Sequence, residues 1–205
     1  MRMHATEFAS AIDGQGVPPV VVLVGSESLL VRQSAQAITR EIFGTPAAAD
    51  DSDTTDDDLS RRDGDQVLFR DIRDELATVS MFATHRVVLV EGADDFIKSN
   101  RTALESYVAA PVKKSVLILQ PKSFPGNTRL AKAVKVSGVV VECTALEGPA
   151  LVRWLGKTST EQHGIELTRD AASLLIELVG SSLSQLETEL AKLASCSPDG
   201  RIDVE

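Results

Sequence analysis

The sequence predicts an α/β fold: a parallel β-sheet with helices on both faces, followed by a small all-helical domain. Short runs rich in valine alternate with helical stretches through the first two thirds of the chain. These runs are mostly apolar at consecutive positions, as in strands buried on both faces. After Cys143 the strand pattern stops, and only helical patterns follow. Alternation of strands and helices is typical of βαβ units, whose strands pair in parallel.

Four apolar runs are expected to form the buried strands of this sheet. They are rich in Val, Leu and Ile, side chains that suit a pleated, buried surface, and they cover residues 20–24, 86–90, 116–119 and 139–141. A further short strand is expected at residues 66–69.

Helices are expected between these strands, because apolar residues recur there at helical spacing. The expected ranges are 26–43, 71–78, 99–108 and 127–136. Ser26 or Ser28 is expected to cap the first helix, and Ser99 or Asn100 the third, because short polar side chains accept bonds from the first free amides.

The helical domain is predicted to begin near residue 145, which divides the chain into 1–144 and 145–205. Its first helix, 148–163, has one apolar face, formed by Leu151, Trp154 and Leu155. Thr168 is expected to cap the second helix, which Gly180 closes. The third, 183–195, presents a stripe of leucines at positions 183, 186, 190 and 193. An α/β domain followed by a helical lid resembles the AAA+ module.

Residues 44–65 interrupt the pattern of strands and helices. Between Asp50 and Asp58, six of nine residues are aspartates. Carboxylates at this density repel one another and bury little apolar surface, which predicts a loop. Hard cations also favour clustered carboxylates, but the stretch lacks the Gly and the terminal Glu of an EF-hand loop. The loop is the favoured interpretation.

Composition places the chain among soluble globular proteins. Of its 205 residues, 43% are hydrophobic; 21 basic and 30 acidic residues give a net charge of −9. This acidic balance argues against DNA binding by the chain alone. Cys143 and Cys196 form no CxxC pair, and two reduced thiols without a metal are expected. The first residues contain no apolar signal-peptide core, so a cytoplasmic location and no membrane partner are expected.

The junction between the first strand and its helix lacks a phosphate-binding loop. A P-loop has the pattern GxxxxGK[ST], whose backbone amides and lysine hold the phosphates. Here the segment 25–30 contains one glycine, Gly25, and no lysine, while Glu27 adds negative charge. Glu91 ends the second strand and only loosely resembles a Walker B residue; a polar strand end is the favoured interpretation. We therefore expect no cofactor and no catalytic residues.

Several segments, taken in order, resemble the delta subunit of the bacterial DNA polymerase III clamp loader. They are Gly25-Ser26-Glu27 followed by Leu29 and Leu30, the tripeptide Ser80-Met81-Phe82, the strand segment 87–94, the helix segment 128–133, the segment Val140-Val141-Glu142-Cys143 and the lid segment 180–193. Their order across nearly the whole chain carries the resemblance, since no single one is decisive.

The resemblance implies a binding site at the apolar pair Met81-Phe82. In this family the pair inserts into a hydrophobic pocket of the sliding clamp, and Ser80, Val79 and Leu76 are expected to support the same surface. On the residues alone, burial in the core is the ordinary expectation for such side chains. The sequence departs from the family pattern at Ala77, where Gln is frequent, and at Met81, where Leu is common.

The resemblance further implies a mechanical function without chemistry of its own. Such a subunit binds and opens the sliding clamp (beta) for loading onto primed DNA in chromosomal replication. Its other implied partners are the ATPase subunits (gamma/tau) and delta prime, with primed DNA contacted only within the complex. The family's chain continues into a third, collar-forming domain, whereas this sequence stops at Glu205; weaker assembly with intact clamp binding is expected.

Three alternatives belong to other classes of protein. An active NTPase is disfavoured by the missing Gly-Lys-Ser/Thr, and a DNA-binding module by the acidic balance. A catalytically inactive AAA+-like adaptor that docks a different protein partner stays open.

Overall fold

The computed structural model describes residues 1–44, 59–78, 85–197 and 200–204. It divides into two compact units, Met1–Thr144 and Ala145–Glu205, and each is described by itself.

The first unit is built on a six-stranded parallel sheet. The strand order is β1-β6-β2-β5-β4-β3, and every pair in the described part of the sheet is parallel. The strands are β1 Arg2–His4, β2 Val20–Val24, β3 Leu59–Asp63, β4 Arg86–Glu91, β5 Ser115–Gln120 and β6 Gly138–Glu142. The four predicted buried strands are confirmed as β2, β4, β5 and β6.

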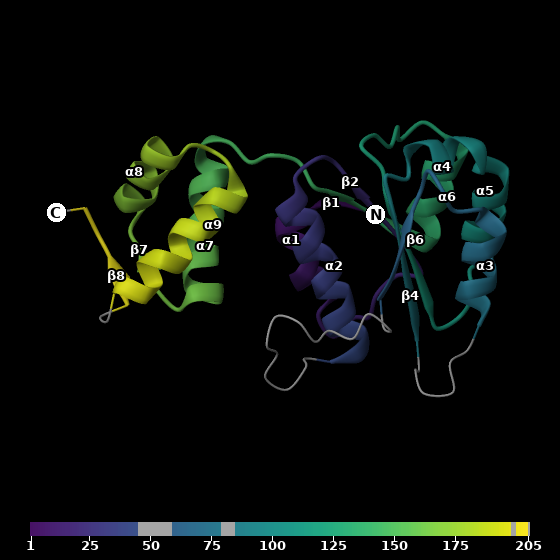
Figure 1. The fold of residues 1–205 in the computed structure, drawn as a ribbon, viewed down its shortest axis with the longest axis horizontal. Helices are drawn as coiled ribbons and strands as arrows, with labels where there is room; N and C mark the ends of the chain where they lie inside the picture. Colours follow the sequence, from purple (N-terminus) through teal and green to yellow (C-terminus); the bar gives the residue numbers. More distant parts are fainter. Residues whose placement is uncertain (45–58, 79–84, 198–199, 205) are drawn as a thin grey trace. The chain divides into compact units, whose positions relative to one another are not determined.

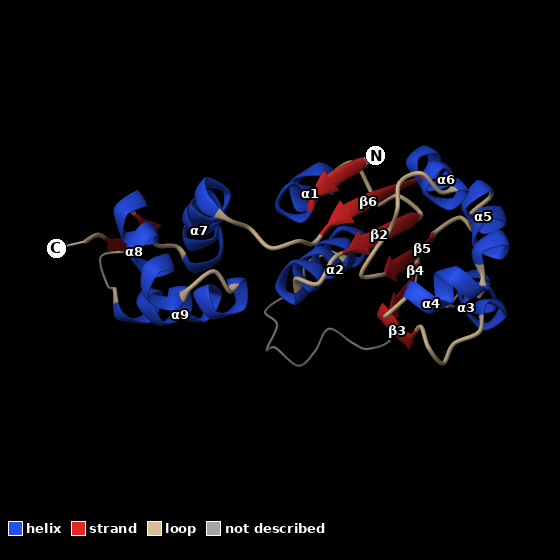
Figure 2. Cartoon of the chain, turned by 90° about the horizontal axis from the view of Figure 1, so that it is seen from above, coloured by secondary structure: helices blue, strands red, loops and turns tan. Residues whose placement is uncertain are grey.

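Helices cover both faces of this sheet, as Figures 1 and 2 show. On one face lie α1 Ala5–Ile12 and α2 Ser28–Phe43; on the other lie α3 Phe69–Ala77, α4 Asp94–Ser99, α5 Arg101–Ala109 and α6 Arg129–Ser137. Strand side chains alternate between the faces. Val20, Val22 and Val24 join the core beneath the second helical layer, while Val21 and Leu23 are fully buried on the opposite side. The two-layered burial explains why β2 is apolar throughout.

Several sequence predictions for this unit are wrong in detail. Residues 66–69 form no strand, because Leu68 already stands at the N-cap of α3. The range 44–65 is not loop throughout, because β3 pairs with β4 inside it. Neither serine caps α2; its N-cap is Glu27, which makes no side-chain cap bond. Asn100 is the N-cap residue of α5, as predicted, but its side chain makes no cap bond there, because its side-chain amide donates to the Phe96 carbonyl of α4.

The second unit contains three helices and one small strand pair in its described part. These are α7 Gly148–His163, α8 Arg169–Val179, α9 Leu183–Cys196, β7 Glu166–Leu167 and β8 Arg201–Ile202. The strand pair corrects the prediction that only helices follow residue 147. Thr168 caps α8 as predicted, since its hydroxyl accepts from the Ala171 amide. The predicted apolar faces meet in the core, where Leu151, Trp154, Leu155, Leu183, Leu186 and Leu190 are buried. Leu193, the last residue of the predicted stripe, is only half-buried.

Candidate functional site

The parallel sheet has two chemically different edges. All its strands begin at one edge, called here the amino edge, and end at the other, called here the carboxyl edge. In open α/β sheets, ligands bind outside the carboxyl ends of the strands. The carboxyl edge is therefore the first place to look for a nucleotide site.

The turn after β2 is packed against backbone where a P-loop would need space. Gly25 has a φ of +138°, and a Cβ placed there would lie 2.1 Å from the carbonyl oxygen of Cys143. The Gly25 amide donates to the Pro121 carbonyl at 3.2 Å, and the Glu27 amide donates to the Cys143 carbonyl at 3.1 Å. Phosphate binding at such a loop depends on free backbone amides. Here two of those donors already bond to protein oxygens.

The neighbouring loop after β5 uses its amides in the same way. The amides of Lys122 and Ser123 donate to the two carboxylate oxygens of Asp94, at 2.9 and 3.3 Å. Asp94 opens α4, and the Ala93 amide before it donates to the Gln120 carbonyl at 3.0 Å. The loops after β4 and β5 therefore hold each other together.

Glu91, at the end of β4, is an exposed strand end. Its carboxylate accepts a bond from the Arg61 guanidinium at 2.9 Å, and both side chains are about half exposed. Its carbonyl accepts from the Gly64 amide at 2.8 Å. This exposed position agrees with the interpretation of Glu91 as a polar residue at the end of a strand.

Cys143 is fully buried beside this turn. Burial raises the pKa of its thiol to about 12, and the negative charge of Glu27 acts in the same direction. A thiol with so high a pKa stays protonated at neutral pH and is a poor nucleophile. Cys143 is thus a packing residue of the carboxyl edge.

Among the residues that the structure describes, no group of His, Cys, Asp and Glu is arranged to hold a metal ion. The alternative of a metal site in the aspartate-rich stretch falls mainly on residues 45–58, which lie outside the described residues. In the described chain, no helix has the length and apolar character needed to cross a membrane.

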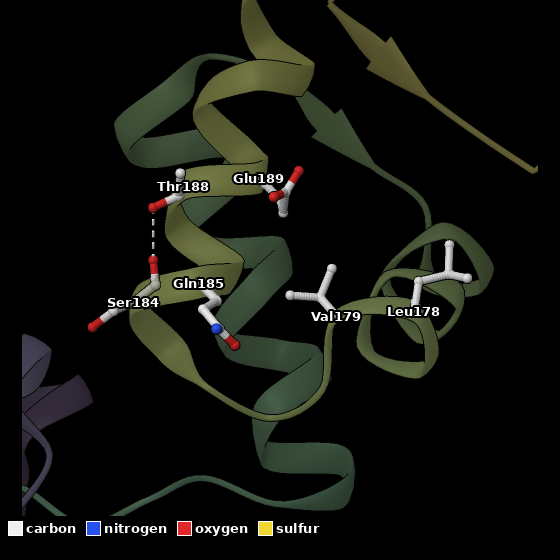
Figure 3. A pocket seen from close by; sticks show the side chains of 6 residues that line it. All are labelled: Leu178, Val179, Ser184, Gln185, Thr188 and Glu189. Carbon is white, nitrogen blue, oxygen red and sulfur yellow. Dashed lines mark hydrogen bonds between the residues drawn. The ribbon is translucent and has the colours of Figure 1, made fainter.

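A shallow pocket lies between α8 and α9 in the second unit (Figure 3). It is lined by Leu178, Val179, Ser184, Gln185, Thr188 and Glu189. The Thr188 hydroxyl donates to the Ser184 carbonyl, and Glu189 pairs with Lys192. With the Thr188 hydroxyl and the one carboxylate already engaged, this lining brings together no set of groups suited to catalysis.

At the amino edge, the predicted site residues fall at the junction of α3 and β4. Val79, Ser80, Met81 and Phe82 lie outside the described residues. Leu76 is described and is buried at 1% exposure, so it supports the junction from inside the core and offers no surface of its own. The Ser115 hydroxyl, at the start of β5, donates to the Leu76 carbonyl at 2.7 Å.

An ion-pair network that sequence reasoning missed fixes the same junction. Glu75, whose side chain is only 11% exposed, accepts from Arg62 on β3 and from Arg86 at the start of β4, both at 3.0 Å. The network joins both flanks of segment 79–84 to the edge strand. Its members lie far apart in the sequence, and the pair Arg61-Arg62 was the only signal, within a range predicted as a loop.

Known proteins resemble this chain in sequence and in fold. Residues 22–144, more than half of the chain, match the family described as DNA polymerase III, delta subunit. DNA polymerase III subunit delta of Bacillus subtilis is 26% identical over 192 residues, which cover 87% of this chain and 52% of that protein. The chain thus spans about half the length of this curated relative.

A solved structure has the same fold. The DNA clamp loader delta protein (YqeN) of Bacillus subtilis superposes with a TM-score of 0.77 at 22% identity, covering 97% of this chain and 59% of that one. The parallel sheet between two helical layers is AAA+-like, as the sequence predicts. Because the family match covers most of the first unit, the chain belongs to the DNA polymerase III delta subunit family.

Proposed function

We propose that this chain binds and opens a sliding clamp, as the delta subunit of a clamp loader. The observation that supports it best is the anchoring of the α3–β4 junction in a chain of this family. Glu75, Leu76 and Arg86 fix both flanks of segment 79–84 to the sheet. A binding segment held at both ends loses little conformational freedom on docking.

The proposed anchor is Met81-Phe82. An aromatic ring with a flexible thioether neighbour buries much apolar area for few immobilised rotors, which is typical of interface hot spots. Ser80 and Val79 adjoin the pair in the sequence, and Leu76 is buried in the last turn of α3.

Opening of the ring would follow from differential binding. A ligand shifts a two-state equilibrium only as far as it prefers one state over the other. A shift from 1:99 to 99:1 requires roughly 5.5 kcal/mol of preference. We therefore expect this chain to bind the open ring more tightly than the closed ring.

The packed carboxyl edge supports a function without nucleotide chemistry. ATP would be bound by sister subunits (gamma/tau), with delta prime completing the assembly and primed DNA contacted only within it, in the cytoplasm. The relative named clamp loader delta protein supports this assignment. The second candidate, an adaptor that docks a different protein through the same segment, requires the same packed edge and is separated from the first by experiment.

The test is binding of the cognate sliding clamp to the chain and to Phe82→Ala, measured by surface plasmon resonance. Phe82→Ala is expected to weaken binding by about 30-fold or more, as for loss of a hot spot. Leu68→Ala, which truncates a half-exposed leucine at the other end of α3, is the matched control and should bind normally.

Two results would overturn parts of the proposal. Unchanged binding by Phe82→Ala shows that the anchor is elsewhere. Absence of clamp binding by the unmodified chain removes the clamp function and leaves the adaptor. Ring opening is measured separately by fluorescence quenching across the ring interface, and quenching that the chain leaves unchanged would argue against opening.

A further inference from the structure

Five exposed residues gather at the amino edge of the sheet, next to the α3–β4 junction. We call them the amino-edge rim: Met1, Lys113, Lys114, Lys135 and Val136. Each of them lies just before the start of β1, β5 or β6. These three strands begin at the same edge because the sheet is parallel.

Hydrogen bonds fix these segments side by side. The Met1 amino group donates to the carbonyls of Lys135 and Gly138, both at 3.3 Å. The Ser137 hydroxyl donates to the Val108 carbonyl at 2.7 Å and so ties the end of α6 to the end of α5. The Arg86 amide donates to the Lys114 carbonyl at 3.0 Å. The rim is therefore continuous with the strand that segment 79–84 enters.

The rim is basic in an acidic protein. From residue 106 to residue 141 there are six Lys and Arg and no Asp or Glu, whereas the whole chain has a net charge of −9. The rest of the chain therefore has a net charge of −15, which is −9 less the +6 of this stretch. The six are Lys113, Lys114, Lys122, Arg129, Lys132 and Lys135. Lys113, Lys114 and Lys135 belong to the rim, whereas Lys122 and Arg129 lie at the carboxyl edge.

The rim lysines have no counter-charge within the described chain. None of Lys113, Lys114 and Lys135 forms an ion pair with a described carboxylate. Nearby Glu75 is already shared by Arg62 and Arg86. Exposed cations that the chain itself leaves unpaired create a positive field at this edge.

Two large apolar side chains stand among these lysines. Val136 is 89% exposed and Met1 is 65% exposed. Surfaces that bind nucleic acid work mainly through contacts to phosphate and sugar, for which exposed aliphatic side chains are of little use. Apolar residues mixed with cations suit an acidic protein surface, where the apolar atoms are covered and the charges lie at the rim.

We propose that the amino-edge rim is a second contact surface for the sliding clamp, docking on an acidic part of the clamp around the pocket that takes Met81-Phe82. This inference rests on the proposed function, because it names the same partner. Charges around an anchor mainly accelerate encounter and fix orientation. The rim therefore steers the clamp onto the anchor, and the anchor holds it.

The test compares two double variants that remove equal charge from opposite edges of the sheet. Lys113→Gln with Lys135→Gln neutralises the rim. Lys122→Gln with Arg129→Gln, in the loop after β5 and at the start of α6, is the matched control at the carboxyl edge. Lys114 is left intact because its φ of +61° makes a substitution there ambiguous. Clamp association and dissociation rates are measured at low and high salt.

The rim variant is expected to associate roughly 5- to 10-fold more slowly at low salt, with its dissociation rate nearly unchanged. The difference should shrink at high salt, which screens exposed charges. The carboxyl-edge control should associate like the unmodified chain.

Three outcomes overturn the inference. They are an unchanged association rate, an equal loss in the carboxyl-edge control, and a loss confined to binding of DNA. If the rim variant binds normally while Phe82→Ala does not bind, the rim is wrong and the clamp function stands. If the unmodified chain does not bind the clamp, the proposed function itself has failed.

Discussion

The two edges of one parallel sheet have opposite characters in this protein. At the carboxyl edge, backbone donors bond to backbone or carboxylate acceptors, and Gly25 lies against the Cys143 carbonyl. At the amino edge, lysines stand without described counter-ions and Val136 is almost fully exposed. The carboxyl edge uses its polar groups within the fold, whereas the amino edge leaves charged and apolar side chains exposed.

This contrast shows how the turn after β2 can use its backbone amides for packing. A phosphate loop needs amides that are free to turn toward a ligand. In this chain the Gly25 and Glu27 amides stabilise the packing of β2 against β5 and β6. The fold survives because its stability lies in the sheet core, whereas a binding function can occupy whichever edge remains accessible.

The largest effect is expected from Gly25→Ala, which attacks the closed edge directly. The added methyl group would meet the Cys143 carbonyl oxygen at 2.1 Å, on a backbone whose φ of +138° already favours glycine. Strain at such a conformation costs of order 1–3 kcal/mol, and the clash adds to it. We expect a loss of about 3 kcal/mol or more, measured by urea unfolding followed by circular dichroism.

Gly92→Ala separates the two causes. Its φ is +59°, but nothing lies within 4 Å of the added Cβ. Only backbone strain remains, so a loss of about 1 kcal/mol is expected. If the two variants are equally stable, the close approach to Cys143 contributes nothing and the carboxyl edge is looser than described.

The buried strands could be predicted from the sequence because each is marked by a run of consecutive apolar residues. β2, β4, β5 and β6 carry apolar runs long enough to distinguish a strand buried on both faces. The leucine stripe of α9 is equally local, since its period follows from the geometry of one helix.

The edge strands could not be predicted in this way. β3 has the sequence Leu-Ser-Arg-Arg-Asp, which has no strand pattern. It exists because it pairs with β4 and because Arg61 pairs with Glu91 on β4 and Arg62 with Glu75 on α3. β1 has three residues and depends on β6, more than 130 positions away. Such elements arise from tertiary pairing that overrides local preference.

The features of the candidate site also differ in whether they depend on local sequence or on the tertiary fold. The absent phosphate loop is a local pattern, and sequence reasoning identified it. The Glu75 network joins three segments of the chain and needed the fold to be seen. Residues Met81 and Phe82 were identified by family resemblance alone, and their role stays a prediction.

An intermediate effect is expected from Glu75→Ala, which tests how firmly the amino edge is held. The change leaves Arg62 and Arg86 without their shared carboxylate. Hydrogen bonds to charged groups contribute roughly 1.5–3 kcal/mol, reduced here by partial exposure of the arginines. We expect a loss of about 2 kcal/mol in unfolding free energy and weaker clamp binding.

Glu91→Ala is the matched control at the carboxyl edge, because it breaks the exposed pair with Arg61. Exposed pairs contribute roughly 0–1 kcal/mol. A loss of stability in Glu91→Ala as large as that in Glu75→Ala would show that both ion pairs are equally important. Normal clamp binding by Glu75→Ala would show that the Glu75 network does not support the proposed binding site.

The smallest effect is expected in the pH dependence of stability, through the buried Cys143 thiol at the carboxyl edge. Burial raises the pKa of Cys143 from an ordinary 9.0 to about 12. Below pH 9 the thiol is protonated in both states and contributes no pH dependence. Between pH 9 and 12 the unfolded chain loses this proton while the folded chain keeps it, so stability falls as pH rises. At pH 10 the loss from this thiol is about 1.4 kcal/mol.

The comparison with Cys143→Ala isolates this contribution. The variant loses some stability at every pH, because it leaves a small cavity, but its unfolding free energy should fall less steeply between pH 8 and 10. Tyr107, whose pKa burial also raises, and the lysines titrate in both proteins and cancel in the difference. Identical slopes would mean that solvent reaches the Cys143 thiol in the folded state. The turn at Gly25 would then be open enough to admit a ligand, and the contrast between the two edges would fail.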